Sequence, residues 1–145
     1  MLKALVLSLA LLAATPALAQ TADDVNAQID SLLGPHEVYA TAVATIQKAL
    51  TEHAVDRLAG YIAYGEPFKV NGEDVTIADE AELTAQFDAL FNDKVVSAVT
   101  GQAYETLFVN ADGIMFGNGE LWITGVCDDD ACEFPFVTIT AINNE

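Results

Sequence analysis

The sequence has little positive charge. Its 145 residues contain five lysines and arginines against 22 aspartates and glutamates, so the formal net charge is −17 at pH 7. Nucleic acids and anionic lipid surfaces bind cationic faces, and the imbalance therefore excludes both as expected partners. The acidic residues are mostly scattered along the chain, which is typical of a solvated surface. The alternative interpretation of this charge is electrostatic steering of a basic partner protein.

Long hydrophobic runs are missing beyond the N-terminus. Residues 1–19 combine the basic Lys3, a run from Ala4 to Ala14 that is apolar except for Ser8, and the small-x-small sequence Ala17-Leu18-Ala19, which is the pattern of a secretory signal peptide. That run is too short to span a bilayer as a helix, and no later segment is long or apolar enough. We therefore predict a signal peptide (1–19), a single domain (20–145) with a net charge of −18, and a periplasmic or secreted location.

Cysteine is scarce too. The two cysteines, Cys127 and Cys132, enclose three aspartates and Ala131. In an exported protein, a pair this close predicts a disulfide, because redox motifs usually have the tighter Cys-x-x-Cys spacing. Zinc would need further ligands, and both histidines lie far upstream. We expect a structural disulfide, no metal and no cofactor, and we interpret Asp128–Asp130 as a solvated hairpin tip rather than a calcium loop.

Motifs for catalysis are absent. The sequence contains no nucleophile elbow, no phosphate-binding glycine loop and no metalloprotease helix. His36 follows Pro35 and His53 lies among acidic residues, and neither is accompanied by a motif that would recruit it to catalysis. Both histidines are therefore expected on the surface, and we predict no catalytic residue.

Helical periodicity covers residues 23–59. Two apolar stripes, separated by Gly34-Pro35, recur at helical spacing: Val25, Ile29, Leu32 and Leu33, then Val38, Ala42, Ile46, Ala49 and Leu50. Thr51 is expected to cap a short third helix that ends before Gly60.

The pattern then changes to strands and one further helical region. Asn71-Gly72 predicts a tight hairpin turn, and Asp79 begins a helix that is interrupted at Asn92-Asp93 and continues to Gly101. Strands are expected at 106–109, 114–116, 121–124 and 136–142. This order predicts an α+β domain in which N-terminal helices pack on a mainly antiparallel sheet.

The sequence resembles the nuclear transport factor 2-like (SnoaL-like, cystatin-like) superfamily, in particular small exported bacterial members without an assigned activity. The residues that carry the resemblance are Leu58-Ala59-Gly60-Tyr61, Phe68-Lys69-Val70-Asn71-Gly72, Ile77-Ala78-Asp79, Leu83, Phe87-Asp88-Ala89-Leu90-Phe91 and the stretch from Leu107 to Ile123. The resemblance implies a cone-shaped fold with a curved sheet around a long helix and a pocket at the wide end. It also implies dimers formed through the sheet, which makes a homodimer a candidate assembly.

For ketosteroid isomerases of this superfamily, the resemblance implies a carboxylate base near the first hairpin and an oxyanion hole made by a tyrosine and a protonated acid. Asn71, which cannot take up a proton at neutral pH, stands near the place of that base. Glu66 or Asp74 would take the place of the base only if the register of this hairpin were shifted relative to that of the isomerases. Tyr39 corresponds to the tyrosine, and Asp112 and Glu120 are the candidates for the acid.

The chemistry of the side chains indicates which residues line the expected pocket. Tyr61, Tyr64 and Trp122 carry a polar group on an apolar body, which suits the wall of a half-wet cavity. Asn118 and Glu120 lie beside Trp122 in sequence and would supply polar groups. With Tyr39, these residues form the predicted ligand-binding set.

The sequence favours binding over catalysis. We expect an exported, non-catalytic protein that holds a small apolar ligand in the cone pocket or a protein partner on the sheet face. One alternative is a SnoaL-like isomerase, cyclase or dehydratase with a pocket carboxylate as its base. Another is an acidic periplasmic inhibitor or immunity-type protein that occludes a basic enzyme.

Overall fold

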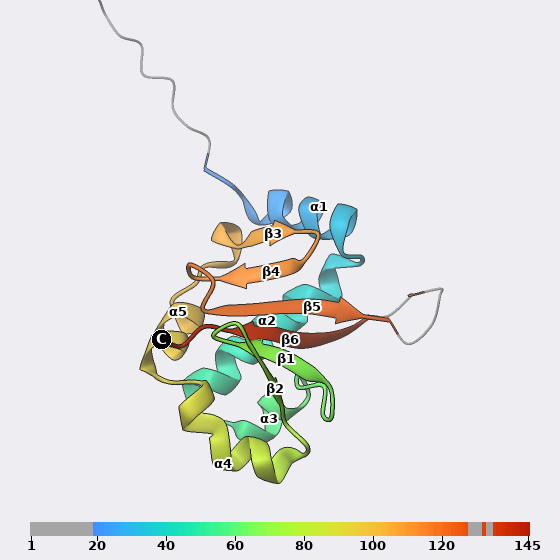
Figure 1. Cartoon of the computed structure of the whole chain (residues 1–145). Helices are drawn as coiled ribbons and strands as arrows, with labels where there is room; N and C mark the ends of the chain where they lie inside the picture. The colour runs from blue at the N-terminus through green and yellow to red at the C-terminus, as the bar shows by residue number, and fades with distance from the viewer. Residues whose placement is uncertain (1–18, 128–131, 133–134) are drawn as a thin grey trace, which may run out of the picture.

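The computed structural model describes residues 19–127, residue 132 and residues 135–145. These residues form helices and one six-stranded sheet (Figure 1). The helices are α1 (Ala22–Leu32), α2 (His36–Glu52), α3 (Val55–Ala59), α4 (Glu80–Leu90), α5 (Asp93–Thr100) and the 3₁₀ turn η1 (Tyr104–Thr106). The strands are β1 (Pro67–Val70), β2 (Glu73–Thr76), β3 (Phe108–Asn110), β4 (Gly113–Phe116), β5 (Leu121–Val126) and β6 (Phe136–Ile142). The predicted α+β class is confirmed. Except for Ala19, the predicted signal peptide lies outside the described residues, and so does Asp128–Asp130.

The sheet has the strand order β2-β1-β6-β5-β4-β3. Neighbouring strands are antiparallel except for β1 and β6, which are parallel. The parallel pairing is short, since it joins only Lys69 to Ala141 and Val70 to Ile142. Among the described strands, β5 is therefore the one that pairs with the first half of β6, and this limited pairing shapes the candidate site.

The helices cover one face of the sheet. Figure 1 shows α2 behind β5 and β6, α1 beside β3, and α3 and α4 at the β1–β2 end. Alternate strand residues point to this covered face, because successive side chains of a strand lie on opposite sides. They pack against the apolar stripes of α1 and α2 in one core that includes Val25, Ile29, Ile46, Phe116, Leu121, Ile123, Ile139 and Ile142. Burial of each of these side chains stabilises the fold by about 1.5–3 kcal/mol.

The turn and cap predictions around the first hairpin are confirmed. Asn71 and Gly72 both have positive φ, 49° and 85°, and form the two-residue connection between β1 and β2. Asp79 caps α4, because its side chain accepts a hydrogen bond from the Glu82 backbone at 2.9 Å. Asn92 caps α5 in the same way, through the Val95 backbone N–H.

Two sequence predictions are wrong. Thr51 does not cap α3; it lies in the last turn of α2, where its hydroxyl donates to the Gln47 carbonyl at 2.8 Å. The helix ends at Glu52, and His53 follows as its C-cap with φ 53°. The buried Ala49 and Leu50 hold this last turn in the core. Thr106 does not begin a strand, because its hydroxyl bonds the Ala103 carbonyl and closes η1 instead.

No helix among the described residues is long and apolar enough to cross a membrane.

Candidate ligand-binding groove

A groove with a volume of about 750 Å³ follows the first half of α2. We call it the α2 groove. Its lining comes from α2, from α3 and the two residues after it, and from the start of β6: Glu37, Val38, Thr41, Ala42, Thr45, Arg57, Gly60, Tyr61, Pro135, Phe136 and Val137. The walls are mainly apolar, and the volume lies within the range of about 300–1,000 Å³ that is usual for small-molecule sites.

The helical repeat of α2 places one wall of this groove. Val38, Ala42 and Thr45 recur at spacings of four and three residues, so their side chains share one face of the helix. From Glu37 to Thr45 the wall is about 12 Å long, because an α-helix rises 1.5 Å per residue. The small side chains of Ala42 and Thr45 leave the hollow between α2 and β6 unfilled.

The charged side chains that the structure describes in the groove lining lie at the two ends of the α2 groove. Glu37, at the start of α2, is exposed, and its side-chain oxygen lies 3.8 Å from Nε2 of His36. At the other end, Arg57 forms an ion pair with Glu52. Among the described lining residues, Glu37 is the only carboxylate, and it is not buried.

A second pocket, of about 490 Å³, adjoins the α2 groove. Its lining is Ala63, Glu66, Pro67, Phe68, Val126, Phe136, Thr138, Ile139 and Thr140. Phe136 belongs to both linings and is 43% exposed. The second pocket opens where β1 has separated from β6, upstream of their short parallel pairing.

Tyr61 is the predicted site residue that lies in the α2 groove. Its side chain is half-buried, and its backbone carbonyl accepts hydrogen bonds from the Ile139 N–H at 2.8 Å and the Thr138 hydroxyl at 3.2 Å. These bonds fix the chain after α3 against the middle of β6.

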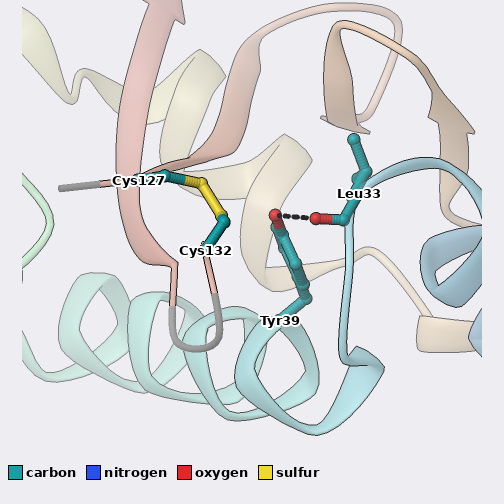
Figure 2. The surroundings of a disulfide bond; sticks show 4 residues. All are labelled: Leu33, Tyr39, Cys127 and Cys132. Atoms are coloured by element: carbon teal, nitrogen blue, oxygen red, sulfur yellow. Dashed lines mark hydrogen bonds between the residues drawn. A yellow bond between two sulfur atoms is a disulfide. The ribbon is translucent and has the colours of Figure 1, made fainter. Parts of the chain in front are cut away.

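Tyr39 lies in the core rather than in the groove. Only 1% of its surface is exposed, and its hydroxyl donates a hydrogen bond to the Leu33 carbonyl at 3.0 Å (Figure 2). Burial raises the pKa of the Tyr39 hydroxyl, an effect partly offset by a hydrogen bond from the Gly125 backbone. Both contacts join α2 to its neighbours, so they give Tyr39 a structural role.

The other predicted pocket residues lie elsewhere. Trp122 points to the face of the sheet away from the helices and lines a shallow depression with Asp112, Thr140 and Ala141. Asn118 and Glu120 occupy the β4–β5 turn, where the Asn118 N–H donates to the Glu120 carboxylate.

Tyr64 precedes β1 and is 36% exposed, and its pKa is raised by partial burial and by the nearby Glu80 and Asp79. Tyr61 and Trp122 thus line different pockets of the described structure, and the predicted set Tyr39, Tyr61, Tyr64, Asn118, Glu120 and Trp122 is not gathered around one of them.

Asn71 holds the C-terminus instead of occupying a cavity. Its side chain bonds both the backbone N–H and the side chain of Asn144, at 2.9 and 2.8 Å. Asn144 also donates to the carbonyls of Ala89 and Leu90 at the end of α4. Of the two substitutes for a base, Glu66 lies at the exposed border of the second pocket and Asp74 pairs with Lys69 at 2.8 Å.

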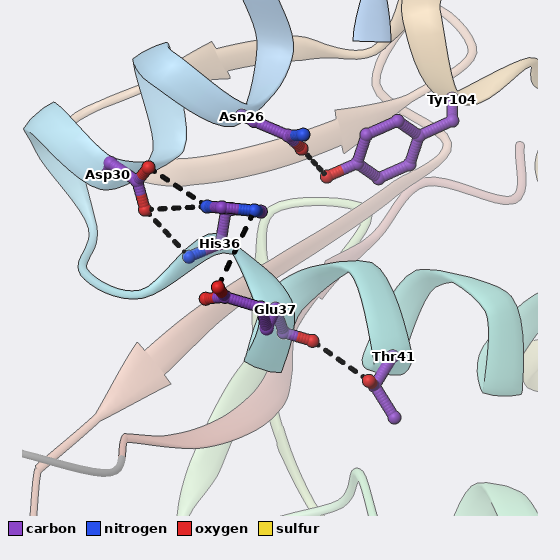
Figure 3. A network of polar contacts seen from close by, with 6 residues as sticks. All are labelled: Asn26, Asp30, His36, Glu37, Thr41 and Tyr104. Carbon is purple, nitrogen blue, oxygen red and sulfur yellow. Dashed lines mark hydrogen bonds and ion pairs between the residues drawn. The ribbon is translucent and has the colours of Figure 1, made fainter. Parts of the chain in front are cut away.

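His36, Asp30 and Glu37 form a polar cluster at the junction of α1 and α2 (Figure 3). Asp30 accepts hydrogen bonds from the His36 backbone and from Nδ1, each at 2.9 Å, and thereby caps α2 in place of Pro35. The pKa of Asp30 is lowered most by the hydrogen bond from the His36 backbone and next by the hydrogen bond from the His36 side chain. The ligating atoms of the three residues lie within 4.8 Å of one another, but the hydrogen bonds already account for this arrangement.

The predicted disulfide is present. Cys127 and Cys132 are bonded, with their Cα atoms 5.1 Å apart, and they join the end of β5 to the chain that leads into β6 (Figure 2). The disulfide therefore constrains the segment that supplies Pro135 and Phe136 to the α2 groove.

The outer face of the sheet carries a row of apolar residues from the edge strand β3 to β6. Phe108, Met115, Trp122 and Ala141 are register neighbours from β3 to β6. The rings of Phe108 and Trp122 meet edge to face with centroids 6.3 Å apart, and Phe108 is 51% exposed. We call these four residues the outer row.

The chain matches no protein-family model, no curated protein and no solved structure.

Sequence reasoning missed the α2 wall and Phe136 as site residues. Val38 and Ala42 were expected on an apolar stripe, and Phe136 in a strand. The small residue Ala42 on that stripe is the one local signal that could have indicated a hollow at this place.

Proposed function

We propose that the protein is an exported, non-catalytic binding protein of nuclear transport factor 2-like fold that holds a small apolar ligand in the α2 groove. The observation that carries the proposal is the groove itself: about 750 Å³ with mainly apolar walls, in which Glu37 and Arg57, at the two ends, are the charged side chains of the described lining. Burial of an apolar ligand in such a groove is favourable by roughly 25 cal/mol per Å² before the costs of association are counted.

Two observations support the fold and the location. The succession of helices, a hairpin, helices and antiparallel strands is the order on which the resemblance was based. The Cys127–Cys132 disulfide fits an oxidising compartment, as expected for a protein exported with a signal peptide.

The isomerase alternative finds less support. A base for proton abstraction needs a pocket carboxylate whose burial raises its pKa. Glu37 in the α2 groove and Glu66 in the second pocket are both exposed. Asn71 and Tyr39 are engaged in contacts that hold the fold together.

The test is binding of the neutral fluorophore N-phenyl-1-naphthylamine to the mature protein. We expect its emission to rise and shift to the blue on binding, and Thr41→Trp, which fills the groove, to abolish this change. Thr51→Trp is the matched control, since Thr41 and Thr51 are both exposed on α2 and both donate to the carbonyl four residues earlier at 2.8 Å. Equal emission from the two variants would contradict the proposal.

The outer row favours a second candidate function, the binding of a second copy of this chain. Phe108, Met115, Trp122 and Ala141 carry no charge in a protein with 22 acidic residues. Two such uncharged rows can meet without bringing carboxylates of their own into the contact. A basic protein partner, as in the inhibitor hypothesis, would instead bind acidic surface and dissociate as salt rises.

A further inference from the structure

The first half of β6 has an open edge beside the α2 groove. On one side, β5 pairs with β6 from Phe136 to Ile142, whereas on the other side β1 reaches only Ala141 and Ile142. Between these positions, the carbonyl of Tyr61 bonds the Ile139 N–H. Before Ile139, no strand of the described chain pairs with this side of β6.

The backbone of Val137 faces this open side. Ile139 donates its N–H to Tyr61 rather than to β5, and in an antiparallel pair the residue two positions away faces the same direction. Gly125 is the register partner of Val137 on β5, and its N–H bonds the Tyr39 hydroxyl instead of β6. The two residues are therefore not a hydrogen-bonded pair, which again turns the backbone groups of Val137 away from β5. The outward N–H and C=O of Val137 have no hydrogen-bond partner among the described residues.

An unpaired strand edge next to apolar walls is the arrangement by which proteins bind peptides as an added strand. We infer that the α2 groove binds a short extended peptide segment whose backbone pairs with the N–H and C=O of Val137. This inference rests on the proposed function, since it names the class of ligand for the same groove. Neither an alkyl chain nor a steroid would use the unpaired donor and acceptor of Val137.

The dimensions of the groove set the length of the segment. The wall from Glu37 to Thr45 is about 12 Å long, and an extended chain rises about 3.3 Å per residue. About four residues of the peptide therefore lie in the groove. Because alternate side chains of a strand point to opposite sides, apolar residues at alternate positions contact Val38 and Ala42.

The charge of the protein indicates which residues flank the apolar centre of the bound peptide. The protein has a net charge of −17, and the exposed Glu37 stands at one end of the groove, so lysine or arginine beside the apolar residues is attracted. Arg57, at the other end, is already paired with Glu52 and does not repel a cationic flank as a free guanidinium would. The partner is thus a basic peptide or protein segment with an apolar, extended centre.

The experiment uses the mature protein and three probes, with binding measured by calorimetry. The first is a pool of capped pentapeptides Lys-X-Val-X-Lys in which X is valine, leucine or phenylalanine. The second is the same pool with N-methyl groups on the three central amides, which removes their donors. The third is decylamine, a cation with an apolar tail and no peptide backbone. We expect the first pool to bind and the N-methylated pool to bind at least about tenfold more weakly, as expected for the loss of backbone hydrogen bonds.

Two variants, each with a control, test whether the peptides bind in the α2 groove. Thr41→Trp is expected to abolish binding of the first pool and Thr51→Trp to leave it unchanged. Glu37→Gln should weaken binding a few-fold and reduce its dependence on salt, whereas Glu105→Gln, an exposed acid of η1, should do neither.

Equal binding of the two peptide pools overturns the inference, because the backbone of Val137 would then play no part. Binding of decylamine that Thr41→Trp abolishes, with no binding of either pool, also overturns the inference but leaves the proposed function standing. If neither decylamine nor the peptides bind, both fail.

Discussion

The carbonyl of Tyr61 accepts the N–H of Ile139 at 2.8 Å, and this hydrogen bond marks the border between the two pockets. Tyr61 lines the α2 groove, and Ile139 lines the second pocket. The bond holds the chain after α3 against β6 at one point, and on the N-terminal side of that point β5 is the one strand of the described residues that pairs with β6. The position of the groove therefore depends on the point at which the chain after α3 meets β6.

Tyr39→Phe should destabilise the fold without any direct effect on the groove. The variant leaves the Leu33 carbonyl and the Gly125 N–H without their buried partner, which costs about 1–3 kcal/mol in the free energy of unfolding. Urea denaturation measures this loss. Tyr104→Phe is the control: its hydroxyl donates to Asn26 at 2.8 Å in a partly exposed place where water can substitute, so its loss should be smaller. A stable Tyr39→Phe protein would contradict the structural role.

Asp30→Asn should change the response of stability to acid. Hydrogen bonds from the His36 backbone and side chain lower the pKa of Asp30 in the folded state. A lowered pKa contributes stability above the unfolded value of about 3.9, and that stability is lost as the pH falls through the folded value. The variant should therefore be less stable near neutral pH and should lose less stability below about pH 4. Thermal unfolding from pH 7 to pH 3 tests this, with Asp23→Asn on the same helix as control.

Asn71 should tolerate glycine better than alanine. Asn71→Gly keeps the positive φ but loses two hydrogen bonds to Asn144, at about 0.5–1.5 kcal/mol each. Asn71→Ala loses the same bonds and also places an ordinary residue at φ 49°, for a further 1–2 kcal/mol or so. Denaturant unfolding of the two variants gives the order, and an alanine variant as stable as the glycine variant would argue against a strained turn.

Phe108→Lys should prevent self-association if the outer row is the contact between two copies. The side chain is half-exposed beside Trp122, so lysine is tolerated in the monomer but places charge in the contact. Sedimentation velocity should show a dimer for the unchanged protein and a monomer for the variant. A monomer in both cases would remove the second candidate function.

The sequence predicts the local elements of this fold well, because their signals are local. Asn71-Gly72 sets its own turn through positive φ, and Asp79 caps α4 through its own side chain. Thr51 shows the limit of such reasoning. A threonine can cap a helix or bond back to the carbonyl four residues earlier, and the burial of Leu50 decides for the second.

The candidate site could not be predicted in the same way. Periodicity indicates that Val38 and Ala42 lie on an apolar face, but not that the start of β6 and the chain after α3 leave a hollow opposite them. Trp122 illustrates the reverse case. Its chemistry suits a cavity wall, yet the register of β5 places it on the face of the sheet away from the helices.

The most direct test of the account is a titration of the ¹⁵N-labelled mature protein with N-phenyl-1-naphthylamine, followed through its backbone amide resonances. The account predicts shifts concentrated at Val38, Ala42, Tyr61 and Val137, with Met115 and Trp122 unchanged. Shifts centred on Met115 and Trp122, or no shifts in the α2 groove at a saturating concentration of the probe, would contradict it.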